Sequence, residues 1–184
     1  MQVQALTIPD VLLVTPRRHA DQRGFFSETF SARDFAAAGI TASFVQENHS
    51  LSVATGVVRG LHYQKWPHAQ GKLVRCVAGS AFDVAVDIRR SSPTFGRHVS
   101  AVLSAESGTQ IWIPEGFAHG FCTLEPNSQI VYKVTDYYAP ECDRGIRWDD
   151  PALAIVWPDV CRQALLSEKD RMQPLLADAP HDFA

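Results

Sequence analysis

His62 is the side chain in this sequence best suited to move a proton. It lies in the alternating segment 57–64, whose pattern favours a β-strand. An imidazole ordinarily has a pKa of about 6.5, so it can take up or release a proton near neutral pH. A histidine alone on a strand is more often a hydrogen-bonded core residue, so its chemistry depends on the residues gathered around it.

Positive charge gathers in the middle of the chain. Residues 48–82 contain no acidic side chain, and they carry the following basic or histidine residues: His49, Arg59, His62, Lys65, His68, Lys72 and Arg75. In a chain of net charge −3, this stretch indicates either a solvated sheet face or a pocket for an anion such as a phosphate ester. Lys72 is expected to share a strand face with Val74 rather than with Arg75. Gly60 predicts a bulge or a close approach of two backbones.

Histidine spacing raises the question of a metal. Two segments match parts of the signatures of cupin barrels: Gly56-x5-His62 and Gly108-x5-Pro114-x-Gly116-x2-His119. In metal-binding cupins the first signature supplies two histidines and an acid, but here Gln64 occupies the second histidine position and His68 or Ala69 the acidic one. Stable transition-metal sites usually need three or four protein ligands. His62 and His119 are the clear candidate ligands, and His68 is the residue that could in principle complete a site. Because a third ligand is not evident, we expect no metal.

The elements that must position these residues are predicted to be short strands. Apolar, β-branched runs recur between glycines and prolines, at residues 11–14, 73–77, 82–88, 99–103, 111–113 and 130–134. This pattern favours an all-β barrel or sandwich. Segment 82–88 alternates, which predicts a strand with one polar face. Ser31 begins a capping-box pattern that predicts a short helix ending at Gly39, and Ser167 is expected to begin another.

Composition narrows the class of protein. With 184 residues, 46% hydrophobic and 20% charged, the chain is expected to form one globular domain, 1–184. The net charge of −3 disfavours nucleic acid and membrane surfaces as partners. The start of the sequence does not resemble a signal peptide, and no apolar stretch approaches the ~20 residues that span a bilayer.

Cysteine spacing and missing motifs exclude further classes. The four cysteines are widely spaced, so we expect free thiols packed as small apolar residues and a cytoplasmic protein: Cys76, Cys122, Cys142 and Cys161. The sequence has no GxGxxG, P-loop or GxSxG pattern. A dinucleotide cofactor, nucleotide hydrolysis and a serine-hydrolase elbow are therefore disfavoured.

Ordered motifs run from about Asp10 to Pro174: Asp21-x-Arg23-Gly24-x-Phe26-x-Glu28-x-Phe30, Gln46-x-Asn48-x-Ser50, Arg59-Gly60-Leu61-His62-x-Gln64, Gln70-Gly71-Lys72-Leu73-Val74, Pro114-x-Gly116-Phe117-Ala118-His119-Gly120-Phe121, Val131-Tyr132-Lys133 and Gly145-Ile146-x-Trp148. Together they resemble the dTDP-4-dehydrorhamnose 3,5-epimerases. The resemblance implies a cupin-like jelly-roll β-barrel with short peripheral helices, a homodimer and no cofactor. It implies as substrate dTDP-4-dehydro-6-deoxy-D-glucose, inverted at C3 and C5 to give dTDP-4-dehydro-L-rhamnose.

The resemblance also implies catalytic roles. The hydrogens on C3 and C5 lie next to the C4 ketone, so removing either one forms an enolate. His62 matches the family's base and Asp170 the acid that orients it. Tyr132 matches the proton donor on the opposite face of the ring, and Lys72 is placed to stabilise the enolate oxygen.

Substrate-binding roles follow from the same resemblance. The matching positions are Arg23 and Arg59 for the pyrophosphate, Lys169 as a further polar contact, Glu28, Gln46 and Asn48 for the nucleotide and sugar, His119 for the sugar pocket, Tyr138 for stacking on thymine, and Asp143 as an acidic contact. The family's N-terminal arm, here about 1–45, reaches into the partner's site, so Arg23 and Glu28 are candidates to act across the dimer. A C-terminal helical segment is expected at about 160–176.

Three alternatives remain open at the level of sequence. A single-centre dTDP-4-keto-sugar epimerase would use the same residues. A non-catalytic sugar-nucleotide-binding cupin would keep the phosphate-binding arginines but would not need His62, Asp170 and Tyr132 together. A metal-dependent cupin isomerase or oxygenase would place its metal on His62 and His119.

Overall fold

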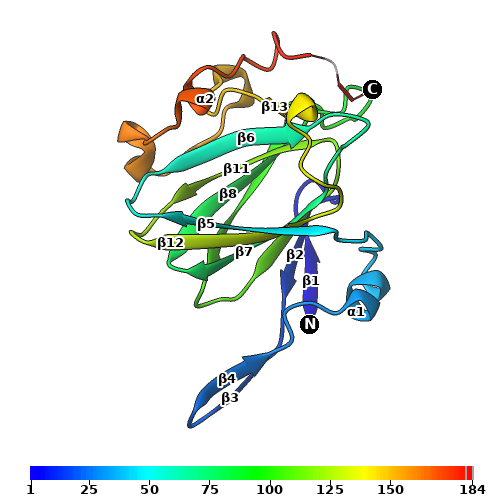
Figure 1. Ribbon diagram of the computed structural model, residues 1–184, viewed down its shortest axis with the longest axis vertical. Helices are drawn as coiled ribbons and strands as arrows, with labels where there is room; N and C mark the ends of the chain where they lie inside the picture. Colours follow the sequence, from blue (N-terminus) through cyan, green and yellow to red (C-terminus); the bar gives the residue numbers. More distant parts are fainter. Residues whose placement is uncertain (181, 184) are drawn as a thin grey trace.

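The computed structural model describes residues 1–180, 182 and 183 and shows two β-sheets packed face to face (Figure 1). The six-stranded sheet has the order β1 (Gln2–Ala5), β2 (Leu12–Thr15), β10 (Gln110–Ile113), β7 (Lys72–Ala78), β12 (Ser128–Val134) and β5 (Gln46–Ser52). The five-stranded sheet has the order β13 (Asp143–Gly145), β6 (Val58–Gln64), β11 (Phe117–Thr123), β8 (Ser80–Asp87) and β9 (His98–Ser104). The chain passes repeatedly between the sheets from β5 to β12. The all-β, jelly-roll prediction is confirmed, although the two sheets form a sandwich and are not hydrogen-bonded into a closed barrel within the described residues.

The main core lies between the sheets, and β8 shows how its strands fill it. Ala81 and Ala85 point into the sandwich and pack with apolar residues of the six-stranded sheet. Val84 and Val86 point the other way and are covered by the C-terminal part of the chain. Because both faces of β8 are buried, the polar face predicted for segment 82–88 lies inside the protein, with Asp83 and Asp87 at 0% exposure.

Both predicted helices are present and begin at the predicted caps. α1 spans Ala32–Ala37, and the Ser31 side chain accepts a hydrogen bond from the amide of Asp34. α2 spans Glu168–Arg171, and Ser167 accepts from the amide of Asp170 at 3.1 Å. Three short 3-10 helices complete the periphery: η1 (Pro140–Cys142), η2 (Pro151–Leu153) and η3 (Asp159–Gln163). Among residues 1–180, 182 and 183, no helix combines the length and apolar character needed to cross a bilayer.

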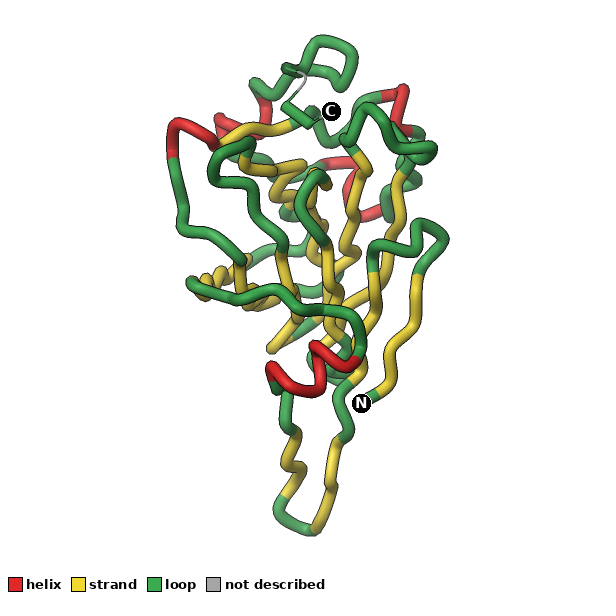
Figure 2. Tube along the Cα trace, turned by 90° about the vertical axis from the view of Figure 1, so that its right-hand side faces the viewer, coloured by secondary structure: helices red, strands yellow, loops and turns green. Residues whose placement is uncertain are grey.

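A β-hairpin near the N-terminus projects away from the sandwich. It consists of β3 (Arg18–Asp21) and β4 (Gly24–Ser27), and it extends from the body in both views (Figures 1 and 2). Phe25 and Phe26 on β4 are 60% and 71% exposed. Neighbouring exposed aromatic side chains on a projecting element are typical of a surface that contacts another chain.

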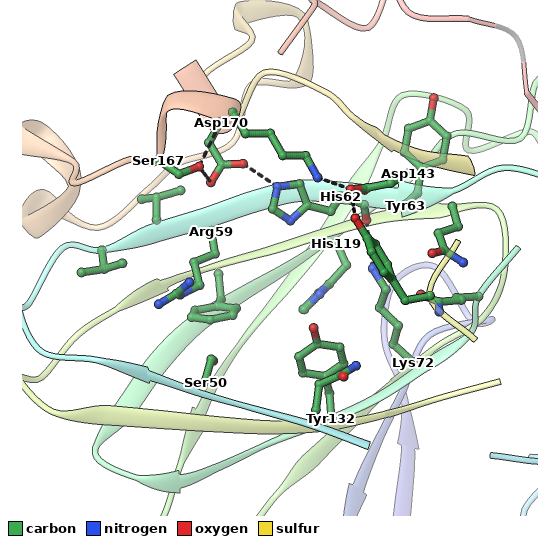
Figure 3. Close-up of a pocket in the computed structure, with 18 of the residues that line it drawn as sticks. Ser50, Arg59, His62, Tyr63, Lys72, His119, Tyr132, Asp143, Ser167 and Asp170 are labelled. Carbon is green, nitrogen blue, oxygen red and sulfur yellow. Dashed lines mark hydrogen bonds and ion pairs between the residues drawn. The ribbon is translucent and has the colours of Figure 1, made fainter. Parts of the chain in front are cut away.

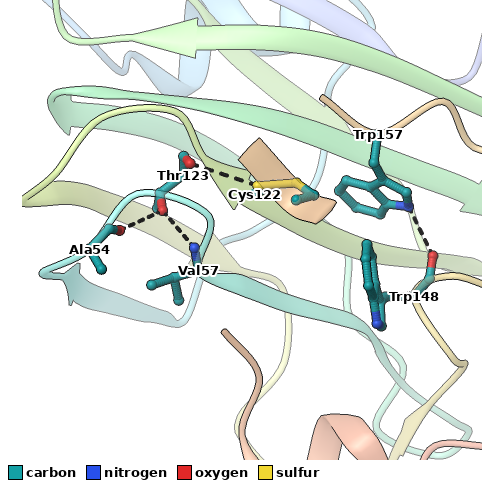
Figure 4. Close-up of a disulfide and its surroundings, with 7 residues drawn as sticks. Ala54, Val57, Cys122, Thr123, Trp148 and Trp157 are labelled. Atoms are coloured by element: carbon teal, nitrogen blue, oxygen red, sulfur yellow. Dashed lines mark hydrogen bonds between the residues drawn. A yellow bond between two sulfur atoms is a disulfide. The ribbon is translucent and has the colours of Figure 1, made fainter. Parts of the chain in front are cut away.

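Two of the four cysteines are joined, which corrects the prediction of four free thiols. Cys122 on β11 and Cys161 in η3 form a disulfide next to the rings of Trp148 and Trp157 (Figure 4). Cys76 and Cys142 are buried free thiols, as predicted. The pair is 39 residues apart in sequence, and only the folding of the C-terminal segment back onto the outer face of the five-stranded sheet brings the two sulfurs together.

We expect reduction of this disulfide to lower the free energy of unfolding by roughly 2–4 kcal/mol, because the bridge restricts the unfolded chain over a loop of this length. Urea denaturation with and without dithiothreitol measures the difference. Cys161→Ser should show the reduced stability under both conditions, whereas Cys142→Ser should keep the response to the reductant. Equal unfolding free energies for the wild-type protein in both buffers would contradict this expectation.

Candidate active site

A cavity of about 710 Å³ opens between the two sheets (Figure 3). Strands from both sheets contribute side chains to it, and the segment that leads into α2 forms a further wall. The residues predicted for the site that line it are Gln46, Asn48, Arg59, His62, Lys72, His119, Tyr132, Tyr138, Asp143, Lys169 and Asp170. The fold therefore brings together residues that are spread over more than half of the sequence.

His62 and Asp170 form a hydrogen-bonded pair at one side of the cavity. Nε2 of His62 on β6 lies 2.5 Å from Oδ1 of Asp170 on α2, and the Ser167 hydroxyl donates to the other carboxylate oxygen at 2.9 Å. Burial acts to raise the pKa of Asp170, but the hydrogen bonds from His62 and Ser167 and the nearby positive charges outweigh it, so the pKa lies below its ordinary value. An ionised Asp170 accepts a hydrogen bond from Nε2–H, which selects the tautomer of His62 with Nδ1 unprotonated.

The backbone at Gly60 sets how β6 presents His62. A Cβ atom at Gly60 would lie 2.5 Å from the Cα of Gly120 on β11, and the φ angle of Gly60 is +134°. The predicted close approach is therefore confirmed, and the β6–β11 register shifts between His119 and Phe121. On the near side of this irregularity His62 pairs directly with His119, so both imidazoles belong to the same row of the sheet and line the cavity.

Tyr132 faces the cavity from the opposite sheet. It lies on β12, across the cavity from His62 on β6 (Figure 3). Burial raises the pKa of the phenol, and the charge of Asp143 adds to this, while Arg59 and a hydrogen bond with Asn48 act in the other direction. The raised pKa keeps the phenol protonated at neutral pH, which is the state that a proton donor needs.

Lys72 enters the cavity from β7. Its side chain shares the inner face with Val74, as predicted, and Nζ donates to the backbone carbonyl of His62 at 3.0 Å. Burial lowers the pKa of this amine to about 8, although the charges of Asp143 and Asp83 oppose that effect. The ammonium form still predominates at neutral pH, so the cavity holds a buried positive charge.

Polar residues near the mouth of the cavity form a connected network. The Gln46 amide donates to Asn48 Oδ1 at 2.8 Å and accepts from the amide of Tyr138 at 3.1 Å. The Tyr138 hydroxyl donates to Asp143 Oδ2 at 3.2 Å, and Lys169 forms an ion pair with the same oxygen. With this network in place Tyr138 is 56% exposed, and it lines one edge of the cavity.

Arg59 lies on the same strand as His62 and is partly tied to the opposite sheet. Its guanidinium donates to the Ser52 hydroxyl at 3.3 Å and to the Leu51 carbonyl at 3.1 Å. A guanidinium has five N–H donors, so these bonds leave others available for an anion in the cavity.

Two residues predicted for the site, Arg23 and Glu28, do not line the cavity of their own chain. Arg23 lies in the turn between β3 and β4, where it forms an ion pair with Asp21. Glu28 follows β4 and lines a separate, smaller hollow near Phe35. Both therefore belong to the projecting hairpin and its base, apart from the cavity of their own chain.

The structure adds residues that the sequence analysis did not assign to the site. Ser50 alternates with Gln46 and Asn48 on β5, and Gln64 alternates with His62 on β6, so strand periodicity could have found both. Phe121 and Leu166 also line the cavity, but an apolar residue in a strand or loop carries no signal that separates a cavity wall from the core.

The basic stretch of the sequence divides between the cavity and the surface. Arg59, His62 and Lys72 line the cavity, whereas His68 pairs with Asp136 at 3.0 Å and neither of these two residues lines it. In the part of the chain that the structure describes, no three His, Cys, Asp or Glu side chains are grouped so that they could hold a metal ion.

Known proteins share this fold and sequence along nearly the whole chain. A family model for dTDP-4-dehydrorhamnose 3,5-epimerase matches residues 5–178. An enzyme of that name from Pseudomonas aeruginosa is 55% identical over 180 residues, covering 97% of this chain and 98% of that protein. The crystal structure of dTDP-6-deoxy-D-glucose-3,5-epimerase from Legionella pneumophila in complex with dTDP-4-keto-L-rhamnose matches with a TM-score of 0.93 and 47% identity, covering 97% of this chain and 94% of that one. A 3′-monoepimerase from Streptomyces bikiniensis in complex with dTDP-quinovose matches with a TM-score of 0.87 and 35% identity, covering 94% of this chain and 87% of that one.

The jelly-roll sandwich and its cavity define the chain as a sugar-nucleotide epimerase, a class of isomerase. More narrowly, the chain belongs to the dTDP-4-dehydrorhamnose 3,5-epimerase family, because the family model spans almost all of it and relatives of that name are 52–55% identical over 93–99% of their own length.

Proposed function

We propose that this protein inverts C3 and C5 of dTDP-4-dehydro-6-deoxy-D-glucose to give dTDP-4-dehydro-L-rhamnose. The observation that carries the proposal is the placement of His62 and Tyr132 on opposite sheets across one cavity, with the Lys72 ammonium inside it. Inversion at carbon requires a base on one face of the ring and a proton donor on the other. Membership of the family supports the choice of substrate.

In the proposed mechanism, His62 Nδ1 removes the hydrogen from C3 or C5. The electrons of the broken C–H bond move into the enolate, whose charge lies largely on the C4 oxygen, and the Lys72 ammonium stabilises that oxygen. Tyr132 then delivers its phenolic proton to the carbon from the other face. The phenolate regains a proton and the imidazolium loses one to solvent, so each inversion exchanges one carbon-bound hydrogen with water. Asp170 holds the imidazole and balances its charge meanwhile.

The polar groups around the reacting centre suit the rest of the substrate. Arg59 and Lys169 are the proposed partners of the diphosphate, because cationic donors recognise phosphate oxygens strongly. We assign Tyr138 to stacking on thymine, since its ring stays exposed at the edge of the cavity. Gln46, Asn48, His119 and Asp143 are the proposed contacts to the nucleotide and sugar.

We further propose that the enzyme is a homodimer in which the hairpin of one chain completes the site of the other. Arg23 and Glu28 lie apart from the cavity of their own chain, and Phe25 and Phe26 are exposed beside them. A hairpin that reaches a second chain would bury these rings and bring the two charged side chains to the partner's substrate.

Hydrogen exchange in D₂O tests the proposed activity. We expect chelator-treated protein without added metal to exchange the substrate's hydrogens at both C3 and C5 for deuterium, as followed by proton NMR. Exchange at one carbon alone would assign the protein to the single-centre epimerases, although the identity of 55% to a 3,5-epimerase, against 35% to the monoepimerase, favours two centres. Loss of exchange after chelation would favour a metal-dependent isomerase, and binding of dTDP without any exchange would leave a binding module.

A further inference from the structure

Asp83 is a buried carboxylate beneath the cavity that the proposed mechanism does not use. It lies on β8, has 0% exposure and stands between Ala81 and Ala85 on the face that packs into the apolar core. Its Oδ2 lies 2.9 Å from Nε2 of His119, and its Oδ1 has no hydrogen-bond partner among the described residues.

The stability of the fold does not explain this side chain. A buried carboxylate oxygen without a partner costs free energy, and apolar residues often replace buried charges without loss of stability. Asp87 lies four residues further along β8 and is also fully buried. Its two carboxylate oxygens, by contrast, accept hydrogen bonds from Arg89, Ser92 and Thr94. We therefore expect Asp83 to have a role other than stabilising the core.

The charges around the cavity indicate that role. The charged or titratable groups that share the cavity with Lys72 are Arg59, His62, Tyr63, His119, Tyr132, Tyr138, Asp143, Lys169 and Asp170. Asp170 is engaged by His62, and Asp143 is engaged by Lys169 and Tyr138. Asp83 is the fully buried carboxylate whose Oδ1 has no hydrogen-bond partner among the described residues. Burial lowers the pKa of Lys72, and the charge of Asp83, after the larger contribution of Asp143, opposes that effect.

We propose that Asp83 is a positioning residue of the epimerase site: Oδ2 fixes the His119 imidazole beside His62, and the buried carboxylate places negative charge near the Lys72 ammonium that faces the enolate. The inference rests on the proposed function, because the charge of Lys72 affects the rate only if an enolate oxygen forms near it. Asp83 acts through His119 and Lys72, without touching the substrate. Since Asp83 is fully buried, its charge acts on Lys72 whether or not a diphosphate engages Lys169 at the mouth of the cavity.

The titration of Lys72 tests the charge of Asp83 without any substrate. Asp83→Asn keeps the size of the side chain and an oxygen for His119, but removes the charge. In protein labelled with ¹³C-lysine, with Lys72→Met for assignment, we expect the pKa of Lys72 to fall by about one unit in D83N. Asp136→Asn is the matched control, because it removes a carboxylate from the His68 pair outside the cavity and should leave the titration in place.

The pH profile of kcat tests whether that charge matters to the reaction. If the pKa of Lys72 is lower, the ammonium loses its proton at a lower pH. The alkaline fall of kcat in D83N should therefore move to lower pH by about one unit, and kcat at pH 8 should decrease by about threefold to tenfold. A folded D83N with an unchanged Lys72 titration overturns the proposal, and so does an unmoved alkaline limb despite a moved titration. Asp83→Ala, which leaves space for water beside His119, carries the same expectations should D83N not fold. Because the titration needs no turnover, it tests the effect of the Asp83 charge on Lys72 even if the D₂O experiment refutes the proposed function.

Discussion

Replacing His62 by Asn should lower kcat by about 10²–10⁴-fold, because the variant lacks a group that can take a proton from C3 or C5. Deuterium exchange into the substrate should fall by the same factor, since exchange begins with that proton transfer. The affinity for dTDP should stay nearly unchanged, because the proposed nucleotide contacts are made by other side chains: Gln46, Arg59 and Tyr138. Proton NMR in D₂O and titration calorimetry with dTDP measure the two quantities.

His68→Asn is the matched control for this variant. It makes the same change in the His68–Asp136 pair, which resembles the His62–Asp170 pair chemically but lies outside the cavity. Exchange at the wild-type rate is expected for H68N. If H62N kept substantial exchange while folding normally by circular dichroism, the assignment of His62 as the base would be wrong.

The sequence predicted local structure well where local rules decide it. The hydroxyls of Ser31 and Ser167 each accept a hydrogen bond from an amide in the first turn of a helix, and each helix begins directly after its serine. Strand alternation placed Lys72 on the inner face with Val74, and Gly60 at a point where two backbones approach closely. The helix caps and the face of Lys72 depend on neighbouring residues only, so periodicity and capping chemistry predict them. The glycine at position 60 indicated a close approach, but not that Gly120 is its partner.

Contacts between distant segments were beyond such rules. Asp170 lies 108 residues from His62, and only the family resemblance connected the two in the sequence. The Cys122–Cys161 disulfide had no signal, because it depends on how the C-terminal segment folds back onto β11. Asp83 reads in the sequence as the polar face of an alternating strand, yet coverage of the other face of β8 by the C-terminal segment puts that polar face inside the protein.

The placement of acid and base on separate sheets makes the two chemical steps separable. In the proposed mechanism His62 and Lys72 form and hold the enolate, whereas Tyr132 only protonates it from the other side. A variant without the phenol should therefore still break C–H bonds. The enolate would then be protonated again from the His62 side or by water, mostly without inversion.

For Tyr132→Phe we accordingly expect the formation of inverted product to fall by about 10²-fold or more, while deuterium enters recovered, uninverted substrate at a much smaller loss of rate. Proton NMR in D₂O distinguishes the two, because loss of the C3 and C5 hydrogen signals reports exchange and new sugar signals report inversion. Tyr137→Phe is the matched control, since Tyr137 is 63% exposed, does not line the cavity and should behave as wild type. Exchange and inversion that decline together in Y132F would show that Tyr132 is not the donor on the opposite face, and unimpaired inversion would remove it from the mechanism.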